Sequence, residues 1–269
     1  VTPMLRLLTI IVFALPLSAE TPRFEWKPGE VHKFKVKQTT TTAETLAGVT
    51  STTTNTMTLA KTWTVGEVND GRATLTMTIT SLRIELTKPV DGKAETTILD
   101  SATAEGAESM KDYLNKAILS CTVDDRGRVS EVKAAAPDAA SRLQAELPFR
   151  IELPEAALAT DTKWDRPFTI KLDPPAGTGE THEAIQSFAV KSREDARTAV
   201  SVSTSLKTVP KEIADLQPLL PWLWEGTIEF DPRAKRYLGA KLAVTREYPN
   251  HAGAGSKFSF SSAFEEVRE

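Results

Sequence analysis

Apolar and polar residues alternate strictly over residues 73–80, which read Ala-Thr-Leu-Thr-Met-Thr-Ile-Thr. Side chains of a β-strand point to opposite faces in turn, so the apolar residues share one face and the threonines share the other. β-Branched polar residues suit a solvated sheet surface. Because the same two-residue period recurs through most of the chain, the pattern predicts an antiparallel sheet with one dry and one wet face.

The strand that begins at residue 73 changes its apolar parity along its length. Met77 and Ile79 stand at odd positions, whereas Leu82 and Ile84 stand at even ones. A shift by one residue is what a β-bulge produces, so we expect the strand to bend near residues 80–81. Segments rich in Asn, Asp and Gly bound it on both sides and predict hairpin turns.

Other strands follow from the same alternation, and the threonine-rich segment 39–64 is expected to form a hairpin that projects beyond the core. Near its centre, over residues 50–56, neither the odd nor the even positions are apolar, so the pairing register is weakly specified. A glycosylated, mucin-like stalk is the alternative for such threonine density. Near the C-terminus, Leu238, Leu242 and Val244 are predicted to face inward. The remaining predicted strands are 32–37, 94–100, the hairpin 121–132, 168–172, 200–206, 228–230, 238–244 and 258–264.

Helical periodicity appears in three places. Over residues 106–119 an apolar stripe is predicted to lie on one face of a helix. Pro137 is suited to the first turn of a second helix that ends near Glu146. A short helical or irregular piece is expected over residues 211–224, because Pro218 and Pro221 prevent a continuous helix. The stripe of the first helix consists of Met110, Tyr113, Leu114, Ala117 and Ile118.

These elements predict an α+β fold: a strongly curved antiparallel sheet, or half-barrel, of about ten or eleven strands with two or three helices on its concave face. No linker divides the chain, so residues 20–269 are predicted to form one domain. Similar hairpins near residues 124–128 and 231–236 suggest two related halves, although the spacing of other landmarks is not constant.

The first nineteen residues have the features of a secretory signal peptide. Arg6 precedes an apolar run over residues 7–17, and small residues end at Ala19. The run is shorter than the roughly 20 residues that a membrane span needs. The alternative is an N-terminal anchor helix. We expect cleavage near Ala19, export to the periplasm or the extracellular space, and no transmembrane segment in the mature chain.

The net charge and the cysteine count limit the binding partners and the cross-links that we expect for this protein. Removing Arg6 with the leader leaves 32 basic against 36 acidic residues, a net charge of −4. A mildly acidic chain without basic runs argues against nucleic acid and against charge-driven membrane binding. Cys121 is the only cysteine, so an internal disulfide is excluded, and its apolar neighbours predict a buried thiol.

No motif in the chain supports catalysis, a metal or a cofactor. The three histidines, at positions 32, 182 and 251, lack companions at ligand spacing. Ser101 has no neighbouring base, and phosphate-loop, dinucleotide and nucleophile-elbow motifs are absent from the sequence. We therefore expect a protein that is not an enzyme.

The densest apolar stretch after the leader covers residues 213–224. One interpretation is a mobile lid or an apolar surface for a lipid or partner; the other is a plug that covers the dry face of the sheet as core. If the sheet and helices enclose a ligand, the side chains expected to contact it are Met77, Ile79, Met110, Leu114, Trp222 and Trp224.

Several short motifs are spread over most of the chain after the leader. They are Trp26-Lys27-Pro28-Gly29-Glu30, Val68-Asn69-Asp70-Gly71-Arg72-Ala73, Leu99-Asp100-Ser101, Val123-Asp124-Asp125-Arg126-Gly127-Arg128-Val129, Leu153-Pro154, Lys163-Trp164 and Gly226-Thr227-Ile228-Glu229-Phe230-Asp231. Together they resemble a family of secreted bacterial domains of unknown function that is frequent in planctomycete-type genomes. More distantly, the arrangement is similar to the lipoprotein-carrier superfamily of Lol type, which implies a half-barrel covered by helices that holds acyl chains. That resemblance transfers no catalytic residue.

Two functional hypotheses follow. The leading one is a non-enzymatic exported protein that binds an apolar ligand, such as a lipid or a lipoprotein acyl chain, between sheet and helices. The alternative is an interaction module of the cell envelope, with an envelope protein as partner and a core filled by its own side chains. Cavity volume separates them, because a ligand site of this class has several hundred Å³.

Overall fold

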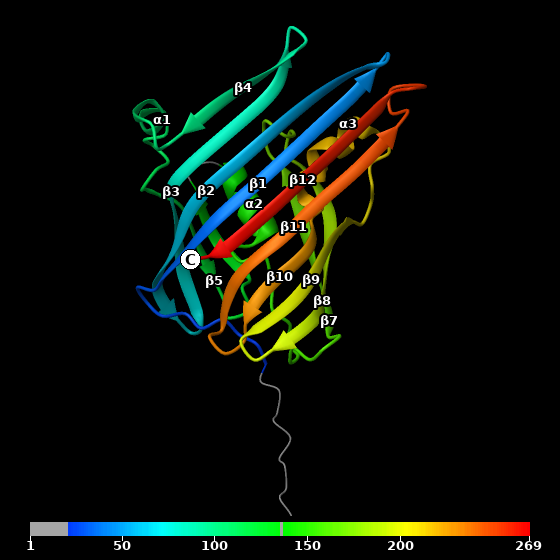
Figure 1. Ribbon diagram of the computed structural model, residues 1–269. Coiled ribbons are helices and arrows are strands. Elements are labelled where there is room, and N and C mark those ends of the chain that lie inside the picture. The colour runs from blue at the N-terminus through cyan, green and yellow to red at the C-terminus, as the bar shows by residue number, and fades with distance from the viewer. Residues whose placement is uncertain (1–20, 135–136) are drawn as a thin grey trace, which may run out of the picture.

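Twelve strands in one antiparallel sheet account for most of the computed structural model, which describes residues 21–134 and 137–269 (Figure 1). The predicted leader, residues 1–19, lies outside the described residues. The strands are β1 (Val31–Leu46), β2 (Val49–Asn69), β3 (Arg72–Val90), β4 (Lys93–Asp100), β5 (Ala117–Val123), β6 (Val129–Ala134), β7 (Lys163–Leu172), β8 (Glu180–Glu194), β9 (Arg197–Leu206), β10 (Glu225–Asp231), β11 (Arg236–Pro249) and β12 (Lys257–Arg268).

The strand order is β6-β5-β3-β2-β1-β12-β11-β10-β9-β8-β7, and β4 pairs with β3 off this path. The first and last strands of the chain, β1 and β12, are neighbours over twelve residue pairs from Phe34–Arg268 to Thr45–Lys257. The sheet is not closed, since β6 and β7 stand at its two ends. It has twelve strands where the pattern predicts about ten or eleven. The hairpin tips β1–β2, β3–β4 and β11–β12 lie at the same end of the molecule (Figure 1).

Helices are few and short. The helix predicted to begin at Pro137 and end near Glu146 is confirmed, because α2 covers Pro137–Glu146. The predicted irregular piece over residues 211–224 is present as α3 (Ile213–Leu216) followed by the 3-10 helix η1 (Gln217–Trp222). Within the described residues, no helix is long and apolar enough to cross a membrane.

The predicted helix over residues 106–119 is wrong over most of its length. Helix α1 covers only Ala104–Ser109, and turns follow it. Asn115 has a left-handed φ of 56°, which a helix does not allow. From residue 117 the alternation of β5 replaces the helical period, with Leu119, Cys121 and Val123 buried. The helical stripe from Met110 to Ile118 therefore does not exist as one face.

The predicted bend in β3 is confirmed. Ala60 pairs with Ser81 and Lys61 pairs with Ile79, so Thr80 is the extra residue of a bulge. The bulge keeps Ile79 and Leu82 on the same face of the sheet despite their change of parity.

The expectation that Leu238 faces inward with Leu242 and Val244 is wrong, because β11 contains a second bulge at this residue. Glu229 pairs with Gly239 and Phe230 pairs with Tyr237, which leaves Leu238 as the extra residue. Tyr237 and Ala240 are buried, whereas Leu238 is half-buried. Leu242 and Val244 are buried as expected.

The core gathers around aromatic side chains from distant parts of the chain. The Phe149 ring lies 5.5 Å from Phe24, 5.7 Å from Trp26 and 5.7 Å from Tyr237, centroid to centroid. Trp63 lies 6.2 Å from Phe149. Separations of 4.5–7 Å are those of favourable ring contacts. The segment after α2 thus inserts its ring among residues of the sheet and of the N-terminal segment.

Candidate functional site

A cavity of about 630 Å³ lies between the sheet and the segment that contains α2. Strands β1, β2, β3 and β12 form one wall, and α2 with residues 147, 148 and 150 forms the other. Most of the lining surface is apolar. The principal apolar residues are Val36, Met57, Leu59, Met77, Ile79, Ile118, Phe260 and Phe264.

The alternation of β2 places a graded series of side chains along this cavity. Trp63, Lys61, Leu59, Met57 and Asn55 all line it, every second residue from the core outward. Trp63 is buried, the three residues between are half-buried and Asn55 is exposed. At about 3.4 Å per residue, the series extends over roughly 27 Å. The cavity therefore runs from the aromatic core towards the hairpin tips.

Charged groups concentrate at the inner part of the cavity. The Lys61 Nζ lies 2.8 Å from an oxygen of Glu266, whose side chain is fully buried. The Tyr237 hydroxyl donates a 2.9 Å hydrogen bond to the other Glu266 oxygen. Burial and the Glu266 charge raise the pKa of Tyr237 well above its usual value, so this hydroxyl remains a donor.

A second ion cluster comes from α2 and the residues after it. Glu146 lies 3.1 Å from an Arg142 nitrogen and 2.7 Å from an Arg150 nitrogen, each at a spacing of four residues. Burial opposes ionisation of Glu146, but the charges of these arginines dominate and lower its pKa to about 2. The Arg150 guanidinium stacks 4.4 Å from the Phe264 ring centroid. Arg150 thereby reaches across from the α2 segment to β12.

Polar contacts hold the C-terminal end of α2 against the sheet. Arg166 of β7 donates hydrogen bonds of 2.6 Å to the carbonyls of Gln144 and Ala145. Cationic side chains at a helix C-terminus satisfy carbonyls that lack partners within the helix. Ser141 donates a 2.6 Å hydrogen bond to Asp173 after β7. Helix α2 also packs on β6, so it bridges the two end strands of the sheet.

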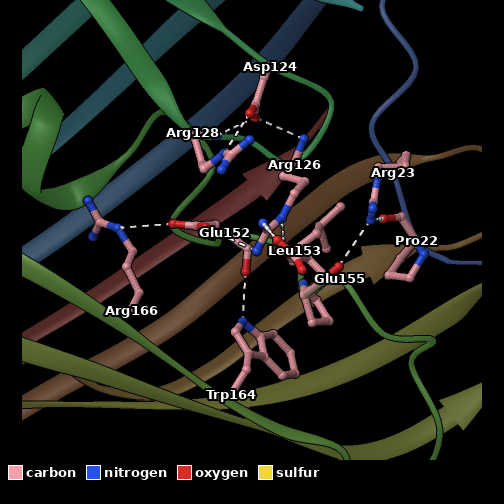
Figure 2. Close-up of polar contacts among 11 residues, drawn as sticks. Pro22, Arg23, Asp124, Arg126, Arg128, Glu152, Leu153, Glu155, Trp164 and Arg166 are labelled. Carbon is pink, nitrogen blue, oxygen red and sulfur yellow. Dashed lines mark hydrogen bonds and ion pairs between the residues drawn. The ribbon is translucent and has the colours of Figure 1, made fainter.

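The segment after α2 is held by the network drawn in Figure 2. Arg126 donates to the Leu153 carbonyl at 2.7 Å and forms ion pairs with Glu152 at 3.1 Å and Glu155 at 2.9 Å. Trp164 donates to the Glu152 carbonyl at 2.7 Å, and Arg23 donates to the Pro154 carbonyl at 3.0 Å. This network fixes the backbone that carries Arg150.

Several of these residues belong to the motifs on which the sequence resemblance rests. Asp124 accepts a 2.6 Å contact from Arg128, and its backbone carbonyl accepts a 3.2 Å hydrogen bond from Trp26. The motifs around residues 26, 124–128, 153–154 and 164, although far apart in sequence, therefore meet at one place. Their contacts hold these separate segments of the chain together.

Of the six candidate ligand residues, Met77 and Ile79 line the cavity and the other four do not. Met110 is buried outside the lining, and Leu114 bridges to Ile79 through the backbone. Trp222 and Trp224 border a separate space of about 10 Å³, which they share with Glu146 and Arg150. That space is about the size of one water molecule.

The charged lining residues were not anticipated from the sequence. Lys61 carried a readable signal, because it interrupts an inward apolar series between Leu59 and Trp63. Arg142 and Glu146 lie one turn apart in α2, whereas Arg150 follows the helix with a left-handed φ of 58°. Only the fold reveals that all three meet the same cavity as Lys61.

Metal and thiol chemistry gain no support from the geometry. Among the residues that the structure describes, no three His, Cys, Asp or Glu side chains form a group that could hold a metal ion. Burial, reinforced by Arg268, lowers the pKa of His32 to about 4, so its imidazole is neutral at pH 7. Burial raises the pKa of the Cys121 thiol to about 12, which makes it unreactive.

Comparison with known proteins assigns no family. No family model matches, and no curated protein matches. Among solved structures, DynF from the dynemicin biosynthesis pathway of Micromonospora chersina is 11% identical over 96% of this chain and 91% of its own, with a TM-score of 0.22. An outer membrane channel from Pseudomonas putida F1 is 10% identical over 91% and 97%, with a TM-score of 0.25. These values are too low to carry a functional argument.

Proposed function

We propose that this chain is a non-enzymatic exported protein that binds an apolar ligand, such as a lipid or a lipoprotein acyl chain, in the cavity between the sheet and α2. In this proposal the sheet is a half-barrel whose concave face is covered by the helical segments. The resemblance to secreted bacterial domains, and more distantly to Lol-type carriers, points in the same direction.

The observation that supports the proposal most is the size and character of the cavity. Protein interiors pack as densely as organic crystals and contain few voids larger than a water molecule. The mainly apolar space of about 630 Å³ is instead a cleft that reaches the surface at the exposed residues Asn55 and Tyr113, so a ligand can enter it. Its volume falls within the roughly 300–1,000 Å³ of small-molecule sites.

The alternative, an envelope interaction module with a self-filled core, is favoured by one segment. Leu219 and Leu220 are fully buried, and Trp224 is 3% exposed. This part of the chain packs as core, as the plug interpretation of residues 213–224 requires. A lid that opens at this segment is therefore not part of the proposal.

Two measurements test ligand binding directly. Mass spectrometry of organic extracts from the purified mature protein should detect a co-purifying lipid. Tryptophan fluorescence should change saturably on titration with a long-chain fatty acid below its micelle concentration. The responding residue should be Trp63, because it lines the cavity.

Matched variants identify the responding tryptophan. Trp63→Phe should remove most of the fluorescence response, whereas Trp26→Phe should retain it, since Trp26 is 9% exposed and packs on Phe149 outside the cavity. If no apolar compound gives a saturable response and no lipid co-purifies, the interaction module is the better description.

A further inference from the structure

The two ion clusters at the cavity are neighbours on the sheet. Lys61 pairs with Glu266, and Arg150 stacks on Phe264, two residues earlier on the same face of β12. Side chains at i and i+2 of a strand lie on one face about 7 Å apart. The cationic ends of Lys61 and Arg150 therefore lie on the same part of the cavity wall.

Cationic side chains outnumber carboxylates among the described residues of this wall. Among the described residues that line the cavity, three are cationic (Lys61, Arg142 and Arg150) and one is anionic (Glu146). With Glu266 behind Lys61, the described side chains at this wall comprise three cations and two carboxylates. Lys61 and Arg150 are each 13% exposed, so solvent screens them weakly.

Apolar residues occupy the cavity beyond this charged region. From Lys61 outward along β2 the lining continues with Leu59 and Met57, and β12 contributes Phe260 and Phe264. The arrangement is polar and cationic inside and apolar further out. It complements a molecule with an anionic end and a hydrocarbon tail.

We infer that the ligand is an amphipathic anion of the fatty-acid type, with its carboxylate at Lys61 and Arg150 beside the exposed Arg142 and its chain directed towards Met57 and Phe260. This inference rests on the proposed function, since it specifies the ligand of the same cavity. A carboxylate is favoured there because it accepts charge-assisted hydrogen bonds from cationic side chains in a weakly solvated environment.

Calorimetric titration of the mature protein with dodecanoate and with 1-dodecanol separates the head group from the chain. At pH 7.5 and below micelle formation, dodecanoate should bind at least about tenfold more tightly than the alcohol. Arg142→Gln should weaken dodecanoate binding about tenfold and leave dodecanol binding unchanged. Arg142 is suited to substitution because its side chain is 49% exposed and the Glu146–Arg150 pair remains.

Arg233→Gln is the matched control, because it removes the same charge from an exposed ion pair with Asp195 outside the cavity. It should bind both compounds as the parent does. The double variant Lys61→Gln/Glu266→Gln, which replaces the buried pair by neutral groups, should also weaken dodecanoate selectively. Circular dichroism and the melting temperature establish that each variant is folded.

The outcomes distinguish the inference from the proposed function. Equal affinities for dodecanoate and dodecanol, or an equal loss of both in Arg142→Gln, would overturn the carboxylate assignment while leaving an apolar site. Tighter binding of dodecyltrimethylammonium than of dodecanoate would also overturn it. If none of the three compounds binds, the proposed function itself fails.

Discussion

Individual buried charges are the most unusual feature of this protein at the residue scale. Replacing a buried ion pair with apolar residues is often neutral or stabilising, whereas removing one partner is costly. Glu266 and Glu146 are thus poorly explained by stability alone. Their positions, Glu266 behind Lys61 and Glu146 in the cavity wall, are compatible with the ligand binding that we propose.

His32 should make stability depend on pH. Its folded-state pKa of about 4 is below the unfolded value near 6.5. A depressed histidine pKa contributes stability that is fully present above about pH 6.5 and is lost as the pH falls towards 4. We expect a loss of up to roughly 3 kcal/mol from this group in urea unfolding between pH 7 and pH 4. His32→Phe should remove that component; an unchanged pH profile in the variant would contradict it.

Trp222, the last residue of η1, and Trp224, two residues later, should differ in their effect on stability. Trp224 is 3% exposed, so Trp224→Ala should cost about 3–5 kcal/mol in unfolding free energy. Trp222 is half-buried, with Arg142 5.6 Å above its ring, so Trp222→Ala should cost clearly less. Similar losses at both positions would mean that Trp222 is buried as deeply as Trp224.

At the scale of single elements, the bulge at Thr80 determines which residues of β3 face inward. Beyond it, Leu82 pairs with Leu59 and Ile84 pairs with Met57. Both partners line the cavity, so the bulge keeps the outer half of β3 in phase with the cavity wall. Without the extra residue, the change of parity in the sequence would turn one half of the strand outward.

Deletion of Thr80 should be tolerated. It removes the unpaired residue and leaves Ile79 and Leu82 two positions apart, on one face in a regular ladder. Deletion of Thr76, the control, should lower the melting temperature strongly, because Met77 and Ile79 then turn to the outer face. Equal destabilisation by the two deletions would show that the bulge itself is required for folding.

At the scale of the whole molecule, β1 and β12 join the two ends of the chain in the middle of the sheet. Their twelve paired residues close a loop of more than two hundred residues, which makes the fold rich in non-local contacts. Such topologies fold slowly. The cavity needs segments from both ends of the sequence, because β1 and β12 both line it.

Export is a prediction for the entire chain. The mature protein should begin at or near Glu20, because the run over residues 7–17 and the small residues ending at Ala19 fit signal-peptide cleavage. N-terminal sequencing of protein from the native host is the measurement. A membrane-bound species that retains Arg6 would instead support an N-terminal anchor.

The sequence alone determined the features that arise from neighbouring residues. Alternation placed Leu242 and Val244 inward, the parity change placed the bulge at Thr80, and Pro137 marked the start of α2. These signals are local, because the direction of a side chain follows from its own strand or helix. Where two periods overlapped, around residues 110–118, the local pattern predicted the wrong element.

Only the tertiary structure decided which strands pair and what lies between them. The pairing of β1 with β12 and the meeting of Lys61 with Glu266 join residues more than two hundred positions apart. Alternation specifies a face but not a partner, since backbone hydrogen bonds are alike in all strands. The cavity depends on how α2 and Arg150 rest on that sheet, so it could not be read from any single segment.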